Sequence, residues 1–355
     1  MSTTVRSART AAAPSDATAP ASPDPAVPGS ATPASDGAPA GSAARPARPS
    51  AAPLAPRRSP QRRRRARRDA LLFGALIAPN LLAILVFSYY PAIYNVGLSF
   101  FDWDFVAPSP EFVGLENYAG LFTDPSFGQV MLNTLLFTAV SVVGSLALGL
   151  LLGSLLATKV PLTGLAQTLA FAPHMLPGAA VGILWLFLFD PNYGLSRWLF
   201  SLVGLASPDW TTTSDWSLWA ITIAYTWQRL GFVTVICYTA ILDLPKDLYE
   251  AAALDGAHGW KLFRHLTLPL LSPIVFFLSI TGIISAAQTF DIISIMTGGG
   301  PGTSSSTLSW MVYEEAFQKF DIGTASAAAT VLLVLLLLIT YAQVRYGQKS
   351  MEGVS

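Results

Sequence analysis

Long runs of apolar residues constrain this chain more than any other feature of its sequence. Each run is about 20 residues long, which is the length an α-helix needs to cross the ~30 Å hydrocarbon core of a bilayer. Only 12% of the 355 residues are charged and 52% are hydrophobic, a composition that does not suit a soluble domain of this size. The sequence therefore predicts an all-α integral membrane protein with six transmembrane helices. These helices cover approximately residues 70–90, 132–157, 165–189, 218–242, 270–293 and 323–341.

Glycine and proline mark particular positions within the predicted spans. Gly149 and Gly153 lie four residues apart in the second span, and Gly178 and Gly182 do so in the third. This spacing lets helix backbones approach one another closely in a membrane. Two prolines, at 173 and 177, are expected to kink or break the third span.

The formal net charge of zero conceals a basic N-terminal tail. Residues 1–68 hold twelve Arg, no Lys and three Asp, and their charge of +9 is balanced by an acidic remainder. The first 60 residues are rich in Ala, Pro and Ser and cannot bury enough apolar surface to fold, so we predict a disordered tail at 1–68. Its Arg cluster adjoins the first apolar run, which favours a role in membrane topology over the alternative of nucleic-acid binding.

The distribution of Lys and Arg orients the predicted spans, because these residues are enriched in cytoplasmic loops. The Arg cluster at 62–68 places the N-terminus in the cytoplasm, and Arg345 and Lys349 place the C-terminus there. Lys246, Lys261 and Arg264 make the loop at 243–269 cytoplasmic. The acid-rich loops, at about residues 91–130, 190–215 and 294–322, are predicted to lie outside.

The cytoplasmic loop at 243–269 has the pattern of two short helices joined at a glycine. Asp243 is placed to cap the first helix, and Gly256 is suited to end it because glycine adopts the left-handed conformation without steric cost. Residues 260–266 form a second short amphipathic helix in this prediction. Small side chains and the carboxylate of Glu250 suit docking into a groove of a partner protein. The alternative, a helix lying on the lipid surface, suits this acid- and alanine-rich segment poorly.

The same loop resembles that of a known family. It consists of Glu-Ala-Ala from Glu250, three residues, Gly256, nine residues, and Leu-Thr-Leu-Pro ending at Pro269. This is similar to the EAA loop of the membrane subunits of ABC importers, which docks into the ATPase subunit; Leu266 stands where isoleucine is commoner. The residues to which the resemblance assigns ATPase coupling are Glu250, Ala251, Ala252, Asp255, Gly256, Leu266 and Pro269.

Further motifs narrow the resemblance to the maltose-type, sugar-transporting permeases, over about residues 70–349. They are TGGGP at 297–301, SWMVYEEAFQKF at 309–320, GTASAAA at 323–329, WQRLG at 227–231, and the pairs Asn117-Tyr118, Asp124-Pro125 and Asn133-Thr134. Gly128 departs from the family pattern, in which an aromatic residue is usual at this position.

The resemblance implies a domain organisation and a set of partners. A permease domain of the type I ABC importer type would occupy residues 69–349, with a core at about 127–349, the coupling loop at 243–269 and a C-terminal tail at 350–355. Its partners would be a second permease in a heterodimer, ATPase subunits that bind ATP and Mg, and an extracellular sugar-binding protein. The chain itself would bind no cofactor, metal or nucleic acid. It would lie in a bacterial cell membrane, with both termini cytoplasmic.

Polar residues within the predicted spans are candidates for the substrate pathway, because such residues are costly in a membrane and often functional. Amides, carboxylates and aromatic faces are the groups that hold sugars. The alternative for each is an interhelical hydrogen bond or an interface anchor; for the arginine it is an ion pair with an acid of a neighbouring span. The candidates are Asn133, Tyr225, Gln228, Arg229, Gln288 and Asp291.

Other functions are less consistent with the sequence. Within the family, the alternative is a permease for glycerol phosphate or another small polar solute. An ion-coupled secondary transporter is a remote alternative, since such carriers usually need mid-membrane carboxylates and no Asp or Glu lies deep in a predicted span. An enzyme is disfavoured because no catalytic set is present. The glycine run at 298–300 is not followed by Gly-Lys-Ser/Thr, so ATP hydrolysis is expected on another chain.

Overall fold

The computed structural model describes residues 60–104, 106–158 and 162–351. Within the described residues, 67–351 belong to one compact unit. The predicted disordered tail falls largely at 1–59, outside the described residues. The prediction extends this tail to residue 68, but helix α1 begins at Pro60, because proline suits the first turn of a helix and arginine is a good helix former. The last helix likewise continues to Met351, past the boundary predicted at 349.

The described chain consists almost entirely of helices. The N-terminal elements are α1 (Pro60–Ile84), η1 (Leu85–Tyr89), α2 (Tyr90–Leu98), β1 (Phe101–Asp102), β2 (Glu111–Phe112), α3 (Glu116–Thr123) and α4 (Phe127–Leu156). The central elements are α5 (Thr163–Phe171), η2 (Ala172–Met175), α6 (Gly178–Leu188), α7 (Leu195–Leu202), α8 (Ser214–Leu242) and α9 (Lys246–Leu254). The C-terminal elements are α10 (Gly259–Leu262), η3 (Phe263–Thr267), α11 (Leu268–Leu270), α12 (Ser272–Ala287), α13 (Asp291–Met296), α14 (Leu308–Tyr313), η4 (Glu314–Gln318) and α15 (Ile322–Met351).

Four helical segments among the described residues are long and apolar enough to cross a membrane: Leu71–Leu98, Phe127–Leu156, Ser214–Leu242 and Ile322–Arg345. Two more qualify only as bent pairs, and counting each pair as one span gives six. Thr163–Met175 meets Gly178–Leu188 at 104°, which confirms the break predicted at the two prolines. Gly259–Leu270 meets Ser272–Ala287 at 69°.

The fifth predicted span differs from the structure at its end. Helix α12 stops at Ala287, and a separate short helix, α13, starts at Asp291. The prediction of one span through Ile293 is therefore wrong, because apolar composition alone does not reveal where the backbone turns between two helices.

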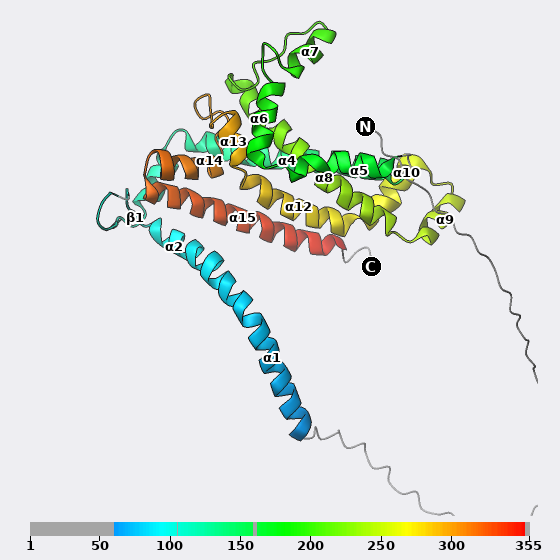
Figure 1. Ribbon diagram of the computed structural model, residues 1–355, viewed down its shortest axis with the longest axis horizontal. Coiled ribbons are helices and arrows are strands. Elements are labelled where there is room, and N and C mark those ends of the chain that lie inside the picture. The colour runs from blue at the N-terminus through cyan, green and yellow to red at the C-terminus, as the bar shows by residue number, and fades with distance from the viewer. Residues whose placement is uncertain (1–59, 105, 159–161, 352–355) are drawn as a thin grey trace, which may run out of the picture. The chain divides into compact units, whose positions relative to one another are not determined.

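Close contact between α4 and α8 forms the centre of the bundle (Figure 1). A Cβ atom added to Gly149 would lie 2.5 Å from Val233 Cγ1, and one on Gly153 would lie 3.0 Å from Cys237 Cβ. In α6, a Cβ on Gly182 would lie 3.0 Å from Ile295 of α13. The glycine pairs therefore stand where helices touch, as their spacing predicts.

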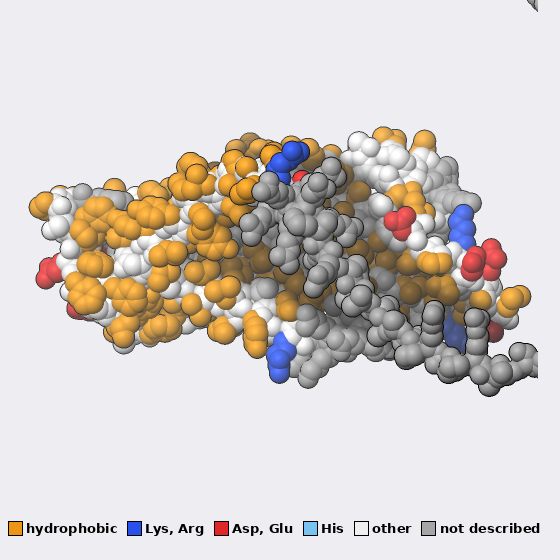
Figure 2. Space-filling view, turned by 90° about the horizontal axis from the view of Figure 1, so that it is seen from below, with side chains coloured by type: hydrophobic (Ala, Val, Ile, Leu, Met, Phe, Trp, Pro, Cys, Tyr) orange, Lys and Arg blue, Asp and Glu red, His pale blue; other side chains and the backbone are white. Residues whose placement is uncertain are grey.

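Hydrophobic side chains also cover most of the described surface visible in Figure 2, as expected for a protein surrounded by lipid. The first long helical segment is the most exposed, since none of the side chains of Leu71–Leu98 is buried. Helices α12 and α15 run side by side, and α14 and α2 also contact α15 (Figure 1).

Two motif residues make hydrogen bonds within the predicted outer segment at 91–130. Asn117 Nδ2 donates to the carbonyls of Ser99 and Phe101, at 2.9 Å each, next to the short antiparallel pair β1–β2. Asp124 Oδ1 accepts hydrogen bonds from the backbone N–H and the hydroxyl of Ser126, at 2.7 and 2.8 Å. These bonds lower the pKa of Asp124 and fix the turn that starts α4.

Candidate functional site

Residues 246–270 form an elbow between α8 and α12. Helix α9 is its first half, and α10, η3 and α11 form its second half, after a turn at Gly256. Gly256 has a φ of +73°, as predicted, and follows Asp255, the C-cap residue of α9. Its N–H donates to the carbonyl of Ala253 at 3.1 Å, and the Ala257 N–H donates to that of Ala252 at 2.9 Å. This pair of bonds is a Schellman motif, which satisfies the last carbonyls of the helix.

The start of α9 corrects one prediction. Asp243 does not cap this helix; its N–H bonds to the carbonyl of Thr239, and it ends α8 instead. Pro245 occupies the N-cap position of α9 without a side-chain hydrogen bond. Asp243 lies two residues before this N-cap position, because α8 extends to Leu242 and α9 begins only at Lys246.

The predicted coupling residues divide into an exposed and a half-buried group. Those exposed are Glu250, Ala251, Asp255 and Gly256, whereas Ala252, Leu266 and Pro269 are half-buried. Within the described chain, neither acidic side chain of this set makes a hydrogen bond or an ion pair. The elbow thus offers two unpartnered carboxylates.

Two large apolar residues that are not among the predicted coupling residues are also exposed on the elbow. Leu254 is 90% exposed and Trp260 is 70% exposed. Leu244, Leu248 and Ala252 form a stripe at i, i+4 and i+8, and Leu254 lies on another face of the helix. An apolar residue away from the apolar stripe could have been predicted from the sequence to be exposed. Exposed apolar residues beside free carboxylates are typical of a protein-binding surface.

The second half of the elbow is continuous with the helical segment that follows. The amphipathic helix predicted at 260–266 is present as α10 and η3, but it runs on through α11 and Pro269 rather than ending. The hydroxyls of Tyr249 and Thr267 lie 3.0 Å apart, which ties α9 to this second half. An apolar pocket lined by residues including Leu155, Ile241 and Phe263 separates the elbow from the ends of α4 and α8.

A second candidate site is a strip of polar side chains on α8, α12 and α13, in an otherwise apolar bundle. Arg229 Nη1 lies 3.4 Å from Ser285 Oγ, and Nη2 lies 3.5 Å from Thr281 Oγ1. Thr281 and Ser285 lie on one face of α12, at i and i+4, and Gln288 is the C-cap residue directly after this helix. We name Gln228, Arg229, Thr281, Ser285, Gln288 and Asp291 the polar strip. Thr281 and Ser285 are additions to the predicted set, which their spacing within an apolar run could have revealed.

Each end of the polar strip is attached to the broken third segment. Gln228 Nε2 donates to the carbonyl of Leu176 at 2.9 Å, at the break between η2 and α6. The carboxylate of Asp291 packs directly on Gly178, the first residue of α6, where a Cβ atom would overlap it. Gln288 and Asp291 are exposed, and Gln228 and Arg229 are half-buried.

Asn133 and Tyr225 are buried, unlike the other four predicted pathway residues. Asn133 is 1% exposed; its Nδ2 donates to the carbonyls of Thr303 and Ser306, at 2.8 and 3.0 Å, and its Oδ1 accepts from Gln129 at 2.8 Å. Its amide therefore holds residues 303–306, which follow the glycine run, by hydrogen bonds. This agrees with the alternative role of a structural hydrogen bond rather than with contact to the solute. Tyr225 is also buried, with its ring against Phe137 at 5.3 Å.

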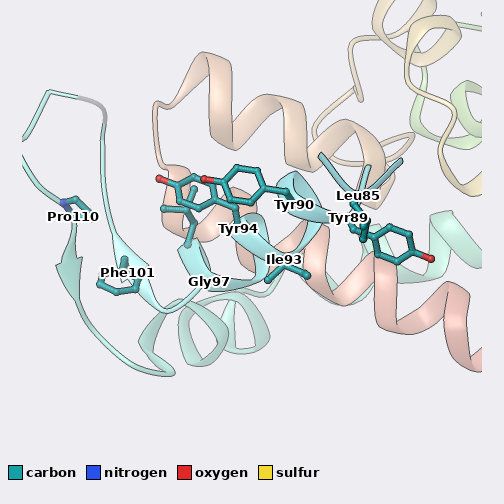
Figure 3. A pocket seen from close by; sticks show the side chains of 9 residues that line it. Leu85, Tyr89, Tyr90, Ile93, Tyr94, Gly97, Phe101 and Pro110 are labelled. Carbon is teal, nitrogen blue, oxygen red and sulfur yellow. The ribbon is translucent and has the colours of Figure 1, made fainter. Parts of the chain in front are cut away.

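A separate groove follows η1 and α2 (Figure 3). The stacked rings of Tyr90 and Tyr94, 6.0 Å apart, form part of its wall with Ile93 and Leu85. It contains neither an amide nor a charged side chain, and no predicted pathway residue lines it. The groove therefore lacks most of the groups that hold a polar solute.

Comparison with known proteins identifies the class to which this fold and these motifs belong. Residues 145–353 match the family described as the binding-protein-dependent transport system inner membrane component. The chain belongs to this family: it is a multi-pass membrane permease subunit of an ABC importer and not itself an enzyme.

Relatives and solved structures agree with this assignment. A probable ABC transporter permease of Pyrococcus horikoshii is 34% identical, over 78% of this chain and 95% of the relative. The sulfoquinovosyl glycerol permease SmoG of Agrobacterium fabrum is 33% identical, over 78% and 90%. The sn-glycerol-3-phosphate permease UgpA of Pectobacterium atrosepticum is 30% identical, over 80% and 97%. A chain of a bacterial ABC transporter involved in alginate import has the same fold, with a TM-score of 0.68 and 24% identity, over 81% of this chain and 99% of that one.

Proposed function

We propose that this chain and a second permease subunit form the membrane pathway through which an ABC importer takes up a sugar. An extracellular sugar-binding protein delivers the solute, and separate ATPase subunits bind ATP and Mg and supply the energy. The observation that carries the proposal is the elbow, with its free Glu250 carboxylate, its exposed small residues and the Schellman turn at Gly256. The curated relatives named for sulfoquinovosyl glycerol and glycerol phosphate support a sugar or, as the alternative, a small phosphorylated polyol.

In this proposal the elbow transmits ATPase closure to the spans. The ATPase subunits bind Glu250, Leu254 and Trp260, which are exposed on the elbow. The Tyr249–Thr267 contact makes both halves of the elbow move together, and α10 to α12 carry the movement into the membrane. The polar strip provides hydrogen-bonding groups along the solute's route, and rocking of the helices gives alternating access.

Co-purification tests the proposal as a whole. Affinity capture of the full chain from its native membrane is expected to recover an ATPase subunit, a second multi-span permease and a solute-binding protein, identified by mass spectrometry. Recovery of the chain alone, in a form that transports without ATP, would overturn the proposal in favour of an ion-coupled carrier.

We further propose that each bent pair is one span, which gives six spans with both termini and the elbow in the cytoplasm. The only cysteine, Cys237, is buried, so engineered cysteines should report their sides with little background. Tyr193→Cys, at a position that is 93% exposed, is expected to react with a membrane-impermeant maleimide on intact cells. Leu254→Cys is expected to react only after the cells are permeabilised. The opposite pattern would contradict this orientation.

A further inference from the structure

Arg229 lies at the middle of the apolar helix α8. This helix runs from Ser214 to Leu242, so at a rise of 1.5 Å per residue Arg229 is about 20 Å from either end. A charged side chain at such a depth is costly when it faces lipid, and it normally faces a bundle interior or an aqueous cavity and pairs with an opposite charge. The surroundings of Arg229 therefore indicate what it binds.

No acid neutralises this arginine within the described part of the chain. Its guanidinium lies near two hydroxyls, at the long distances of 3.4 and 3.5 Å, and Cζ is 5.0 Å from the centre of the Phe232 ring. Hydroxyls and an aromatic face orient a cation but leave its net charge in place. A guanidinium has five N–H donors, so most of its donors remain free for another group.

Asp291 is the acid of the polar strip, and its carboxylate is engaged elsewhere. Oδ1 accepts the backbone N–H of Ile292 at 3.0 Å, and the carboxylate packs on Gly178 at the start of α6. The positive end of that 11-residue helix favours a negative charge at this point. The structure thus holds Asp291 at a helix N-terminus and leaves Arg229 without a counter-ion.

We infer that the solute carried by this permease is anionic, with a carboxylate, phosphate or sulfonate group that binds Arg229 halfway across the membrane. An oxyanion matches the planar fork of a guanidinium and forms charge-assisted hydrogen bonds with it. Gln228 and Gln288, the two amides of the polar strip, supply hydrogen-bonding groups for hydroxyls of the same solute. The inference rests on the proposed function and narrows its substrate class.

The test uses the complete transporter, reconstituted in liposomes with its binding protein. The probe is a small-molecule extract of the native growth medium, separated at pH 7 on a quaternary-ammonium resin. The retained, anionic fraction is expected to stimulate ATP hydrolysis and the neutral flow-through is not. Stimulation by the flow-through alone would overturn the inference but leave the import function intact. Stimulation by neither fraction would contradict the proposed function itself.

Variants of Arg229 connect the charge preference to this residue. Arg229→Gln is expected to raise the half-saturating amount of the retained fraction about 10- to 100-fold, the range for a lost charged hydrogen bond, with little change in maximal rate. Arg229→Lys, which keeps the charge, should lose much less. Arg197→Gln is the matched control, because Arg197 is an exposed arginine bonded to the Pro191 carbonyl at 3.1 Å.

Two results would show that Arg229 has a different role. An unchanged response in Arg229→Gln would mean that the solute does not contact this side chain. Loss of the second permease from the purified Arg229→Gln complex would mean that the arginine pairs with an acid of that subunit. Either outcome overturns the inference.

Discussion

A chain carrying both Glu250→Ala and Gly256→Leu is expected to lose ATP-driven import, while still inserting into the membrane in normal amounts. The first change removes a free carboxylate from the elbow surface. Losing one partner of a charge pair that becomes buried costs about 2 kcal/mol or more, or roughly thirtyfold in affinity for the ATPase subunit. The second change places a branched side chain at a φ of +73°, which strains the backbone by about 1–2 kcal/mol and alters the direction in which the chain leaves α9.

The chain itself provides a closely matched control for this variant. Asp247 is an exposed acid on the same helix, and Gly204 has the same φ of +73° with no atom within 4 Å of an added Cβ, as at Gly256. The combination Asp247→Ala with Gly204→Leu should import normally. Uptake in proteoliposomes and the amount of ATPase recovered with each variant measure the difference. Normal uptake by the elbow variant would contradict its coupling role.

Gly231→Ala is expected to destabilise the bundle by roughly 1–3 kcal/mol, the usual cost of overfilling a packed interior. A Cβ atom at Gly231 would overlap the backbone carbonyl of Ala170 in α5, and a backbone cannot move aside as a flexible side chain can. Helices α5 and α8 must therefore separate. The expected readout is a lower temperature at which half of the detergent-solubilised chain aggregates.

A second glycine, on the opposing helix, separates the effect of packing from that of the substitution itself. Gly164 in α5 has no atom within 4 Å of an added Cβ, so Gly164→Ala is expected to leave stability unchanged or to raise it by about 0.5–1 kcal/mol, because alanine is the better helix former. Equal stability of the two alanine variants would show that α5 and α8 do not pack as described.

Features set by local sequence could be predicted well. The break at Pro173 and Pro177, the left-handed Gly256 and the contacts of the glycine pairs all depend on the conformational limits of single residues or on helical spacing. Asp243 shows the limit of this reasoning, because whether it ends one helix or caps the next depends on the exact residues at which α8 ends and α9 begins.

Features set by contacts between distant segments could not be predicted to the same degree. Asn133 and Gln288 are both amides in apolar runs, yet one is buried against the segment at 303–306 and the other is exposed. Sequence spacing carries no information about which helix lies opposite. The same applies to Arg229, because only the packed bundle shows that no acid of the described residues pairs with it.

The exposure of Leu71–Leu98 has a consequence for how this protein can diverge. Since no side chain of this segment is buried in the chain's own core, substitutions there are constrained by the surrounding lipid and neighbouring subunits more than by the interior. The part of the segment before α2 can therefore adapt to a thicker membrane or a new subunit while the core from α4 to α15 keeps its packing. Substitutions before α2 can thus suit a different membrane or partner without disturbing the core, whereas α2 also contacts α15.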